Sequence, residues 1–204
     1  MSQRKRKEHD RYQRRYFDSS VDTFLLTIPK EVEDKTRSIV QAAHLDKMSR
    51  VLDVGTGCGV LIKHFLEEGL QMSNIAACDL SAKMLAEAKT RYPAATFWQG
   101  DIVDLPGNAG KFDAIFFNAC FGNIYDQKKA LSACGGRLSP GGKIVLSHPL
   151  GKIFVEKLHL HDAQLVPHCL PAAAILKNWA SAFKLKLDMF QDDQDFYLAI
   201  LSAA

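Results

Sequence analysis

The stretch VLDVGTGCG places three glycines, Gly55, Gly57 and Gly59, at alternating positions directly after a short apolar run. Glycine lets the backbone approach a ligand closely and adopt dihedral angles that are closed to other residues. In an open α/β sheet, the loop that follows the first strand lies at the carboxyl edge, where ligands bind. The spacing therefore predicts a loop that holds a nucleotide or a cofactor.

The same spacing separates classes of ligand. Dinucleotide-binding loops follow the pattern G-x-G-x-x-G, and Val60 stands where that pattern needs its last glycine. Asp53, two residues before the loop, would bring a negative charge close to a pyrophosphate, whereas it would attract a cation. These residues argue against a nicotinamide dinucleotide, and hence against a dehydrogenase, and they favour a cationic ligand.

Two further carboxylates end or follow predicted strands: Asp79 in ACDLS and Asp101 in WQGDIVDLP. Each of the three acids also has a structural alternative. Asp53 could bond the amides of the loop, Asp79 could cap a helix, and Asp101 could open a turn. The three together at these positions favour a ligand site.

The elements that would position these residues alternate between apolar runs and amphipathic stretches. Strands are predicted at RVLDV, NIAACD, TFWQG, FDAIFFN and KIVLSH, and helices at GVLIKHFLEEGL, SAKMLAEAKTRY, DQKKALSACGGRL and PAAAILKNWASAF, with SPGG as a turn. Ser81 is placed to cap the second of these helices. Strand–helix alternation of this kind predicts a doubly wound α/β sheet with parallel strands at its centre.

The C-terminal end departs from this alternation. KLKLDMF and DFYLAILSA are separated only by QDDQ, and a parallel crossover needs a dozen residues or more, so these two strands must pair antiparallel. We therefore predict an α/β, Rossmann-like three-layer sandwich, with a mostly parallel seven-stranded sheet that ends in an antiparallel hairpin. We expect residues 1–34 to form a basic lead-in and lid helix and residues 35–204 to form a single domain.

The motif D-x-G-x-G-x-G after a strand resembles the first motif of the class I S-adenosylmethionine-dependent methyltransferases. FDAIFFN resembles the fourth-strand motif of that family, LSPGGKIVLS its turn and fifth strand, and the terminal hairpin its reversed last strand. The resemblance covers residues 35–204. It implies S-adenosyl-L-methionine as cofactor, with S-adenosyl-L-homocysteine as product, and an enzyme of the small-molecule branch.

The resemblance also implies which residues hold this cofactor. Asp79 would bind both ribose hydroxyls, Asp101 would accept from the adenine amine, and Asn118 would lie next to the sulfonium. The implied set is Asp53, Gly55, Thr56, Gly57, Gly59, Asp79, Leu80, Asp101, Ile102, Asn118 and Tyr16. A pocket edged by three carboxylates suits a ligand that carries a sulfonium, an amino group and a ribose diol.

The N-terminal segment DRYQRRYFDSSVDTF resembles the helix that closes over the cofactor in quinone methyltransferases and their relatives. Tyr12, Tyr16 and Phe17 would then cover the methionine end and exclude water. The alternative is an aromatic face that packs on the edge of the sheet.

The residues that would bind the methyl acceptor are less clearly marked by sequence motifs. The sequence after Asn118 is Ala-Cys-Phe, without the two prolines of the amino-methylating branch, which argues against methylation of bases or glutamine. We expect Cys120 to pack near the site. His148 ends the fifth predicted strand and is the candidate catalytic residue, with Asn118, either as a base or as a group that orients the acceptor.

His159, His161 and His168 follow, but an HxH pair on a helix diverges by about 200° and lacks good metal-ligand spacing, so no metal site is predicted. Whether these histidines together with His148 bind a metal or the substrate is not set by the sequence. The identity of the acceptor, its reacting atom (O, S, N or C) and the oligomeric state are not set by the sequence.

The charge of the chain is unevenly distributed. The net charge is +3, but residues 1–15 alone carry a net charge of +5, so the body is slightly acidic. A nucleic-acid-binding surface would normally place basic residues on the body. We therefore expect a small-molecule acceptor, and RKRKEHDRYQRR to be a solvated lead-in to a helix. An RNA or protein methyltransferase that uses this basic tail, and a catalytically silent binding module, stay as alternatives.

The cysteine content and the lack of long apolar segments indicate the cellular compartment that we expect. The five cysteines are scattered and odd in number, which favours reduced thiols. There is no signal-peptide pattern and no apolar run near the ~20 residues that span a bilayer. We expect an intracellular, cytoplasmic protein without a membrane span, with the nucleus or an organelle left open.

Overall fold

A seven-stranded sheet organises the part of the chain that the computed structural model describes, residues 3–203. The strands are β1 Val51–Val54, β2 Ile75–Asp79, β3 Thr96–Gln99, β4 Phe112–Asn118, β5 Leu138–His148, β6 Leu185–Asp193 and β7 Phe196–Ala203. The α-helices are α1 Gln3–Ser19, α2 Val21–Phe24, α3 Lys30–Ala42, α4 Val60–Glu67, α5 Ala82–Arg91, α6 Gln127–Gly135, α7 Gly151–His161 and α8 Ala173–Ala182. The predicted strand–helix alternation is confirmed.

The strand order is β3-β2-β1-β4-β5-β7-β6. All pairs from β3 to β5 are parallel, and β7 runs antiparallel to both β5 and β6. The short connection between β6 and β7 requires their antiparallel pairing. Chain order reverses between β1 and β4, so the loops after these two strands diverge there and leave a crevice at the carboxyl edge. The predicted α/β architecture with its antiparallel hairpin is confirmed.

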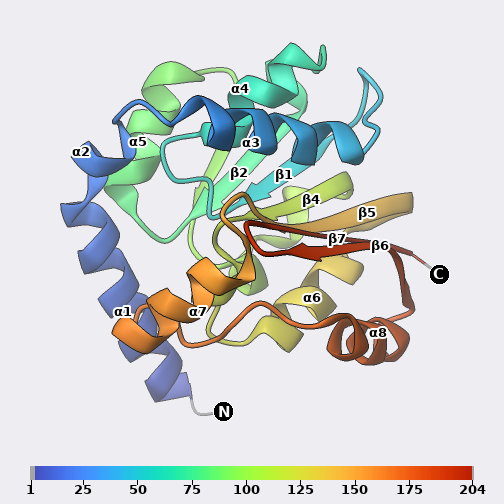
Figure 1. Cartoon of the computed structure of the whole chain (residues 1–204). Coiled ribbons are helices and arrows are strands. Elements are labelled where there is room, and N and C mark those ends of the chain that lie inside the picture. Colours follow the sequence, from blue (N-terminus) through green and yellow to red (C-terminus); the bar gives the residue numbers. More distant parts are fainter. Residues whose placement is uncertain (1–2, 204) are drawn as a thin grey trace.

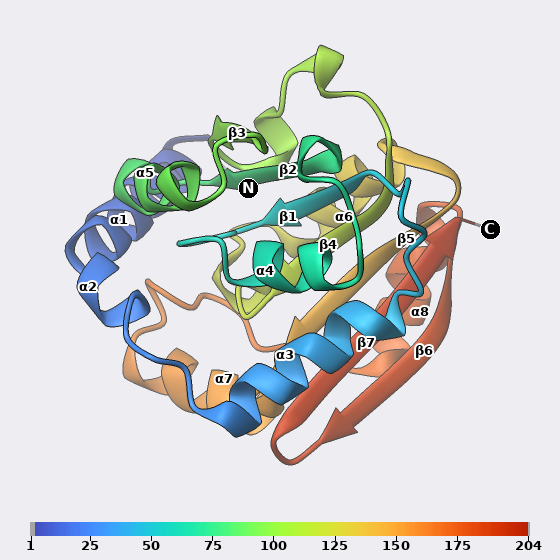
Figure 2. The same ribbon diagram turned by 90° about the horizontal axis from the view of Figure 1, so that it is seen from above.

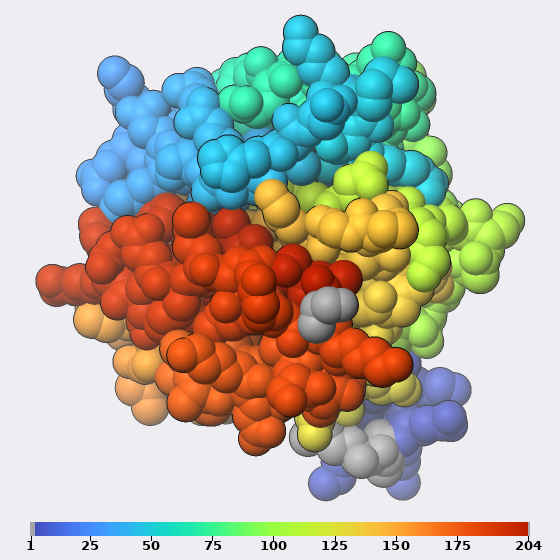
Figure 3. Space-filling view, turned by 90° about the vertical axis from the view of Figure 1, so that its right-hand side faces the viewer, coloured from blue at the N-terminus to red at the C-terminus, as the bar shows by residue number. Residues whose placement is uncertain are grey.

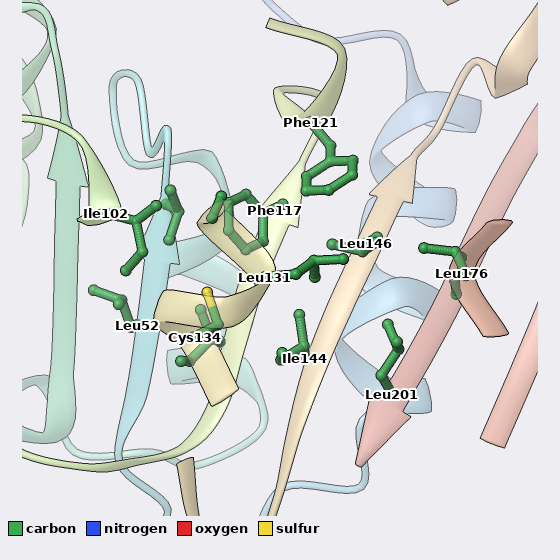
Figure 4. Packing of buried hydrophobic residues seen from close by; sticks show 14 of the residues in the cluster. Leu52, Ile102, Phe117, Phe121, Leu131, Cys134, Ile144, Leu146, Leu176 and Leu201 are labelled. Atoms are coloured by element: carbon green, nitrogen blue, oxygen red, sulfur yellow. The ribbon is translucent and has the colours of Figure 1, made fainter. Parts of the chain in front are cut away.

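Helices cover both faces of the sheet, which gives three layers (Figures 1 and 2). On one face α3 and α4 pack against central strands through Ile39, Ile62 and Phe65, all fully buried. On the other face α6 and α8 cover a second core, to which Leu131 and Leu176 contribute together with Phe117 of β4, Leu146 of β5 and Leu201 of β7 (Figure 4). The central strands β1, β2 and β4 are almost wholly buried and largely apolar, whereas the edge strands β3 and β6 are mostly exposed or half-buried and carry polar residues.

Two local differences from the predicted elements occur in the C-terminal half. The SPGG segment, predicted as a turn, lies within β5, where a register shift between Phe112 and Ala114 of β4 accommodates the extra residues as an irregularity of the ladder. QDDQ was expected to separate the last two strands, but β6 continues through Asp193, so that only Gln194 and Asp195 form the connection.

The N-terminal segment is helical. RKRKEHDRYQRR forms the first part of α1 itself rather than leading into a helix, and most of its side chains are exposed. The expected boundary between residues 34 and 35 falls inside α3, whose Ile39 and Val40 belong to a core of the sheet. Figure 3 shows the start of α1 projecting below the body, on the side away from α3.

Phe117 offers a test of how strongly the sheet depends on its apolar core. Its side chain is fully buried and meets Phe121 edge-on, with ring centroids 5.2 Å apart. Phe117→Ala should lower the free energy of unfolding by about 3–5 kcal/mol because it leaves a cavity. Urea denaturation measures the change. Leu26→Ala, at a side chain that is 68% exposed, is the control and should stay within about 0.5 kcal/mol of wild type.

Candidate functional site

A cavity of about 500 Å³ lies at the carboxyl ends of the central strands. Ten of the eleven residues predicted to hold the cofactor line it, as does the predicted catalytic His148: Asp53, Gly55, Thr56, Gly57, Asp79, Leu80, Asp101, Ile102, Asn118, Tyr16 and His148. Gly59 is the exception. It begins α4 at φ 85°, and a Cβ there would lie 2.8 Å from the Tyr92 ring, so its role in the structure is to pack the helix.

The loop from Gly55 to Gly57 has the open backbone that the glycine pattern predicted. Gly55 has φ 69° and packs on Cys120, which a Cβ would approach within 2.8 Å. Gly57 has φ 55°, and a Cβ would meet nothing within 4 Å, so its backbone borders free space on the cavity side. Positive φ at both positions explains why side chains are excluded.

Asp53 is buried at the end of β1, where one of its oxygens accepts a hydrogen bond from the Thr56 hydroxyl at 2.7 Å. Burial raises the pKa of Asp53 to about 7, although the hydrogen bond from Thr56 opposes the shift and nearby Asp79 adds to it. In the protein without a ligand, this carboxyl therefore carries a penalty for being charged that a nearby cation would remove.

Asp79, at the end of β2, accepts hydrogen bonds from the backbone N–H of Gly57 at 2.9 Å and of Ser81 at 2.8 Å. It thus holds the glycine loop against the start of α5. Ser81 itself caps α5, accepting from the N–H of Met84 as predicted. Burial raises the pKa of Asp79. Each oxygen keeps lone pairs for a ligand, so the structural and the binding role are compatible.

Asp101 follows β3 and caps the short 3₁₀ turn Ile102–Asp104 by accepting from the N–H of Val103 at 3.1 Å. Its other oxygen lies 3.2 Å from Nη2 of Arg6 on α1. The alternative role considered for Asp101, opening a turn, is therefore present in the structure, and both oxygens already have partners inside the protein.

Asn118 ends β4 and accepts a hydrogen bond from the Ser147 hydroxyl of β5 at 3.0 Å. Ala119 follows in the left-handed region, with φ 55°, a strained conformation for a residue with a side chain. The Cys120 thiol donates to the carbonyl of Val54 at 3.0 Å, and burial raises its pKa well above the ordinary value. Cys120 therefore packs beside the site as a neutral thiol.

His148 ends β5 and is 5% exposed. Its Nδ1 accepts a hydrogen bond from the backbone N–H of Leu150 at 3.1 Å. Burial lowers the pKa of His148 to about 4, so the ring is neutral near pH 7. With Nδ1 occupied as an acceptor, the single proton of the neutral ring resides on Nε2. Within residues 3–203 no group bonds this Nε2.

Helix α1 forms a roof over the cavity. His9, Gln13 and Tyr16 share one face of this helix and line the cavity, as does Phe17. Gln13 donates to the carbonyl of Leu165, and His9 lies between the carbonyl oxygens of Gln164, 3.1 Å from Nδ1, and Asn123, 2.9 Å from Nε2. Tyr12 instead donates to Asp162 at 2.7 Å, so it anchors the roof rather than covering the cavity.

The opposite wall of the cavity is apolar and was not predicted. It is built from the lead-in, from the loop after β4, and from α7 with the segment that follows it: Phe24, Ile28, Val32, Ile124, Tyr125, Leu150, Phe154, Leu158, Leu165 and Val166. Phe154 and Leu158 lie four residues apart on α7, a helical spacing that the sequence alone could have indicated.

The remaining histidines bond backbone carbonyls. His159 lies 2.7 Å from the oxygen of Val166, and His168 lies 3.0 Å from that of Tyr125. Across residues 3–203 no group of three or more His, Cys, Asp or Glu side chains is arranged to hold a metal ion. In the same range no helix is long and apolar enough to cross a membrane.

Within residues 3–203, the Asp, Glu, Lys and Arg residues that line the cavity are all acidic. Its lining residues include four carboxylates, Asp10, Asp53, Asp79 and Asp101, and among the described residues that line it there is no Lys or Arg. A cavity with this wall attracts cations and hydrogen-bond donors, and it disfavours a polyanion such as a pyrophosphate.

Residues 51–142 match the family model of a methyltransferase domain. The chain is 35% identical over 116 residues to a demethylmenaquinone methyltransferase of Renibacterium salmoninarum, covering 55% of this chain and 48% of that protein. It is 32% identical over 123 residues to a malonyl-[acyl-carrier protein] O-methyltransferase of Erwinia billingiae, covering 60% and 46%. The chain thus spans about half the length of these relatives.

Solved structures match almost the whole chain in fold. A magnesium protoporphyrin IX methyltransferase from Synechocystis, with bound S-adenosylhomocysteine, superposes with a TM-score of 0.69 at 16% identity, covering 95% of this chain and 98% of that one. A methyltransferase from Clostridium acetobutylicum superposes with a TM-score of 0.65 at 16% identity, covering 87% and 93%.

The buried carboxyl of Asp53 predicts how stability depends on pH. The folded chain keeps the proton up to about pH 7 and the unfolded chain releases it near pH 4, so stability falls as the pH rises through this window. Asp53→Asn removes the charge and keeps an acceptor for Thr56. Its stability advantage over wild type should shrink by about 2–3 kcal/mol between pH 8 and pH 5.

Urea denaturation of the ligand-free protein at both pH values measures this advantage. Asp22→Asn, at an exposed position on α2, is the matched control and should give no such change. An advantage of Asp53→Asn that is the same at both pH values would contradict the raised pKa.

Proposed function

Because the chain belongs to the class I S-adenosylmethionine-dependent methyltransferases, we propose that it binds S-adenosylmethionine in this cavity and methylates a small, largely apolar acceptor. The observation that carries the proposal is the wall with four carboxylates and no basic side chain among the described lining residues. A sulfonium and an ammonium group complement such a wall, whereas the pyrophosphate of a dinucleotide does not.

The space beside the glycine backbone fits this cofactor. Nothing lies within 4 Å of a Cβ built at Gly57 or at Gly100, both of which have positive φ and border the cavity. The volume of about 500 Å³ lies within the range of small-molecule sites. A side chain at either glycine would occupy the space in which a ligand meets the backbone.

The residues divide along the cavity by what each can bind. Asp79 and Leu80, after β2, hold the ribose, and Asp101 with Ile102, after β3, holds the adenine. Asp53, Thr56 and Asn118, at the ends of β1 and β4, face the methionine part, and Tyr16 covers it from α1. All of these residues line the cavity, which supports the assignment.

When bound, S-adenosylmethionine supplies a methyl group on a positively charged sulfur. What the chain contributes is alignment and exclusion of water, because holding two reactants in near-attack geometry can lower a barrier by ~7–11 kcal/mol. The roof of α1, bonded through His9 and Gln13 to the far wall, encloses the reactants.

His148 serves as a hydrogen-bond donor that orients the acceptor, rather than as a base. A base needs a free lone pair, and the lone pair of Nδ1 is already used by the N–H of Leu150. The neutral ring holds its proton on Nε2 and presents it to the acceptor. Its lowered pKa, about 4, also makes the ring a weak base at neutral pH.

The residues on the side proposed for the methyl acceptor favour a small, apolar acceptor. Phe24, Phe154 and Leu158 line the cavity and are each more than a third exposed, so they surround its entrance. The basic side chains Arg11, Arg14 and Arg15 of α1 are exposed and do not line the cavity, which disfavours a polyanionic acceptor held at the reaction centre. The relatives' names mention a quinone and an acyl carrier, so the reacting atom stays open.

Cofactor binding is tested by calorimetry with S-adenosylhomocysteine. Asp79→Ala should raise its Kd about 10- to 100-fold, because a hydrogen bond to a charged group is lost. NAD should give no heat of binding. Asp188→Ala, at an exposed position of β6 far along the chain from the cavity loops, is the control, and thermal unfolding checks that each variant folds. Equal Kd values for wild type and Asp79→Ala would sink the assignment.

Turnover of a methylated acceptor tests the role of His148. If Nε2 only donates, His148→Ala should lower kcat about 2- to 12-fold, and His148→Gln, which keeps a donor near that place, should recover part of the loss. The rate should be flat between pH 6 and pH 8. A loss of about 10²–10⁴-fold, without recovery by Gln and with a rate that rises through this range, would instead show a general base.

A further inference from the structure

Asp10, on the cavity face of α1, is a carboxylate without a hydrogen bond. Its side chain is 16% exposed, and its nearest cation is Arg6, whose Nε lies 3.8 Å from Oδ2, beyond hydrogen-bond distance. Oδ1 is the one buried side-chain nitrogen or oxygen atom within residues 3–203 that has no partner. The prediction from sequence had not included this residue.

An enclosed carboxylate without a donor is unfavourable. Leaving a buried acceptor unpaired is destabilising, and more so when the group is charged. Burial accordingly raises the pKa of Asp10. Elsewhere the described chain satisfies its buried polar atoms, so an exception that lines the ligand cavity indicates a partner that comes with the ligand.

The contacts of Arg6 show which end of the cavity Asp10 occupies. The guanidinium lies between Asp10, Asp101 and Asp104: Nη2 is 3.2 Å from Oδ2 of Asp101, and Nη1 donates to Oδ1 of Asp104 at 3.3 Å. Asp10 and Asp101 both line the cavity, while Asp104 is not among its lining residues. Asp10 is therefore at the adenine end, beside Asp101.

The two carboxylates at this end differ in what they can still accept. Asp101 already accepts from the N–H of Val103 and contacts Arg6 with its other oxygen. Asp10 accepts nothing, and rotation of the terminal carboxyl torsion exchanges its two oxygens at little cost. Of this pair, Asp10 has the larger unused capacity to accept a hydrogen bond.

We propose that Asp10 is a further cofactor-binding residue, whose carboxylate accepts a hydrogen bond from the exocyclic amine of the adenine. This inference rests on the proposed function. The amine carries two N–H groups, so Asp10 and Asp101 can each receive one. A purine with an oxo group at this place presents lone pairs to Asp10 and is repelled, so this residue selects adenine from the side of the roof.

A consequence follows for the roof. Because Asp10 belongs to α1, the cofactor bonds the roof directly, in addition to the bonds that His9 and Gln13 make to the far wall. Binding of the adenosine part therefore stabilises α1 where it lies over the cavity.

The test compares two ligands by calorimetry: S-adenosylhomocysteine and S-inosylhomocysteine, in which an oxo group replaces the amine. Wild type should bind the adenosyl compound much more tightly. Asp10→Asn should raise the Kd of S-adenosylhomocysteine about 10- to 100-fold. It should lower the Kd of the inosyl compound, because the Asn amide can donate to the oxo group, so the preference between the two ligands collapses.

Two matched variants separate this role from a structural one. Asp104→Asn removes another carboxylate from Arg6 without touching the cavity lining, and Glu8→Gln makes the same chemical change on the exposed face of α1. Both should keep the wild-type preference, and circular dichroism should show that all variants are folded.

The outcomes separate the two proposals. If Asp10→Asn leaves the preference unchanged, or if Asp104→Asn reduces it as strongly, Asp10 does not read the adenine, while cofactor binding stands. If wild type fails to bind S-adenosylhomocysteine at all, the proposed function is wrong and this inference falls with it.

Discussion

The carboxylate of Asp79 holds together the three segments on which the site depends. Its two oxygens accept from the backbone N–H of Gly57 and of Ser81, so the end of β2, the glycine loop after β1 and the start of α5 share one acceptor. The register of β1 with β2, in which Val54 lies opposite Cys78, brings these segments within reach. Once this bond network is in place, the loop backbone borders open space rather than collapsing onto the sheet.

Much of this arrangement could be predicted because it is encoded locally. Continuous apolar runs mark strands that are covered on both faces, and the distance between the last two runs requires the antiparallel hairpin. Asp53, Asp79 and Asp101 stand at strand ends, where chain direction alone brings side chains to one edge. The positive φ of Gly55 and Gly57 confirms the physical reason for their spacing.

The roof and the far wall could not be predicted, because long-range contacts create them. His9 and Gln13 lie in a strongly basic stretch that looks solvent-exposed, and they are buried only because α1 packs against a segment more than 150 residues away. The chemistry of His148 was also hidden, since the bond that occupies Nδ1 comes from the backbone of Leu150, and backbone donors leave no mark on side-chain patterns. Gly59 also has a packing role that its place in the motif does not reveal, because a Cβ there would lie 2.8 Å from the Tyr92 ring, and it is not among the residues that line the cavity.

The placement of α1 has a kinetic consequence. The same helix lines the cavity with Asp10 and Tyr16 and bonds the far wall through His9 and Gln13, so one helix covers both the place proposed for the cofactor and the place proposed for the acceptor. If α1 covers the bound cofactor as proposed, exchange of spent cofactor involves breaking the few polar anchors of this helix, a step of the kind that limits the turnover rate of many enzymes.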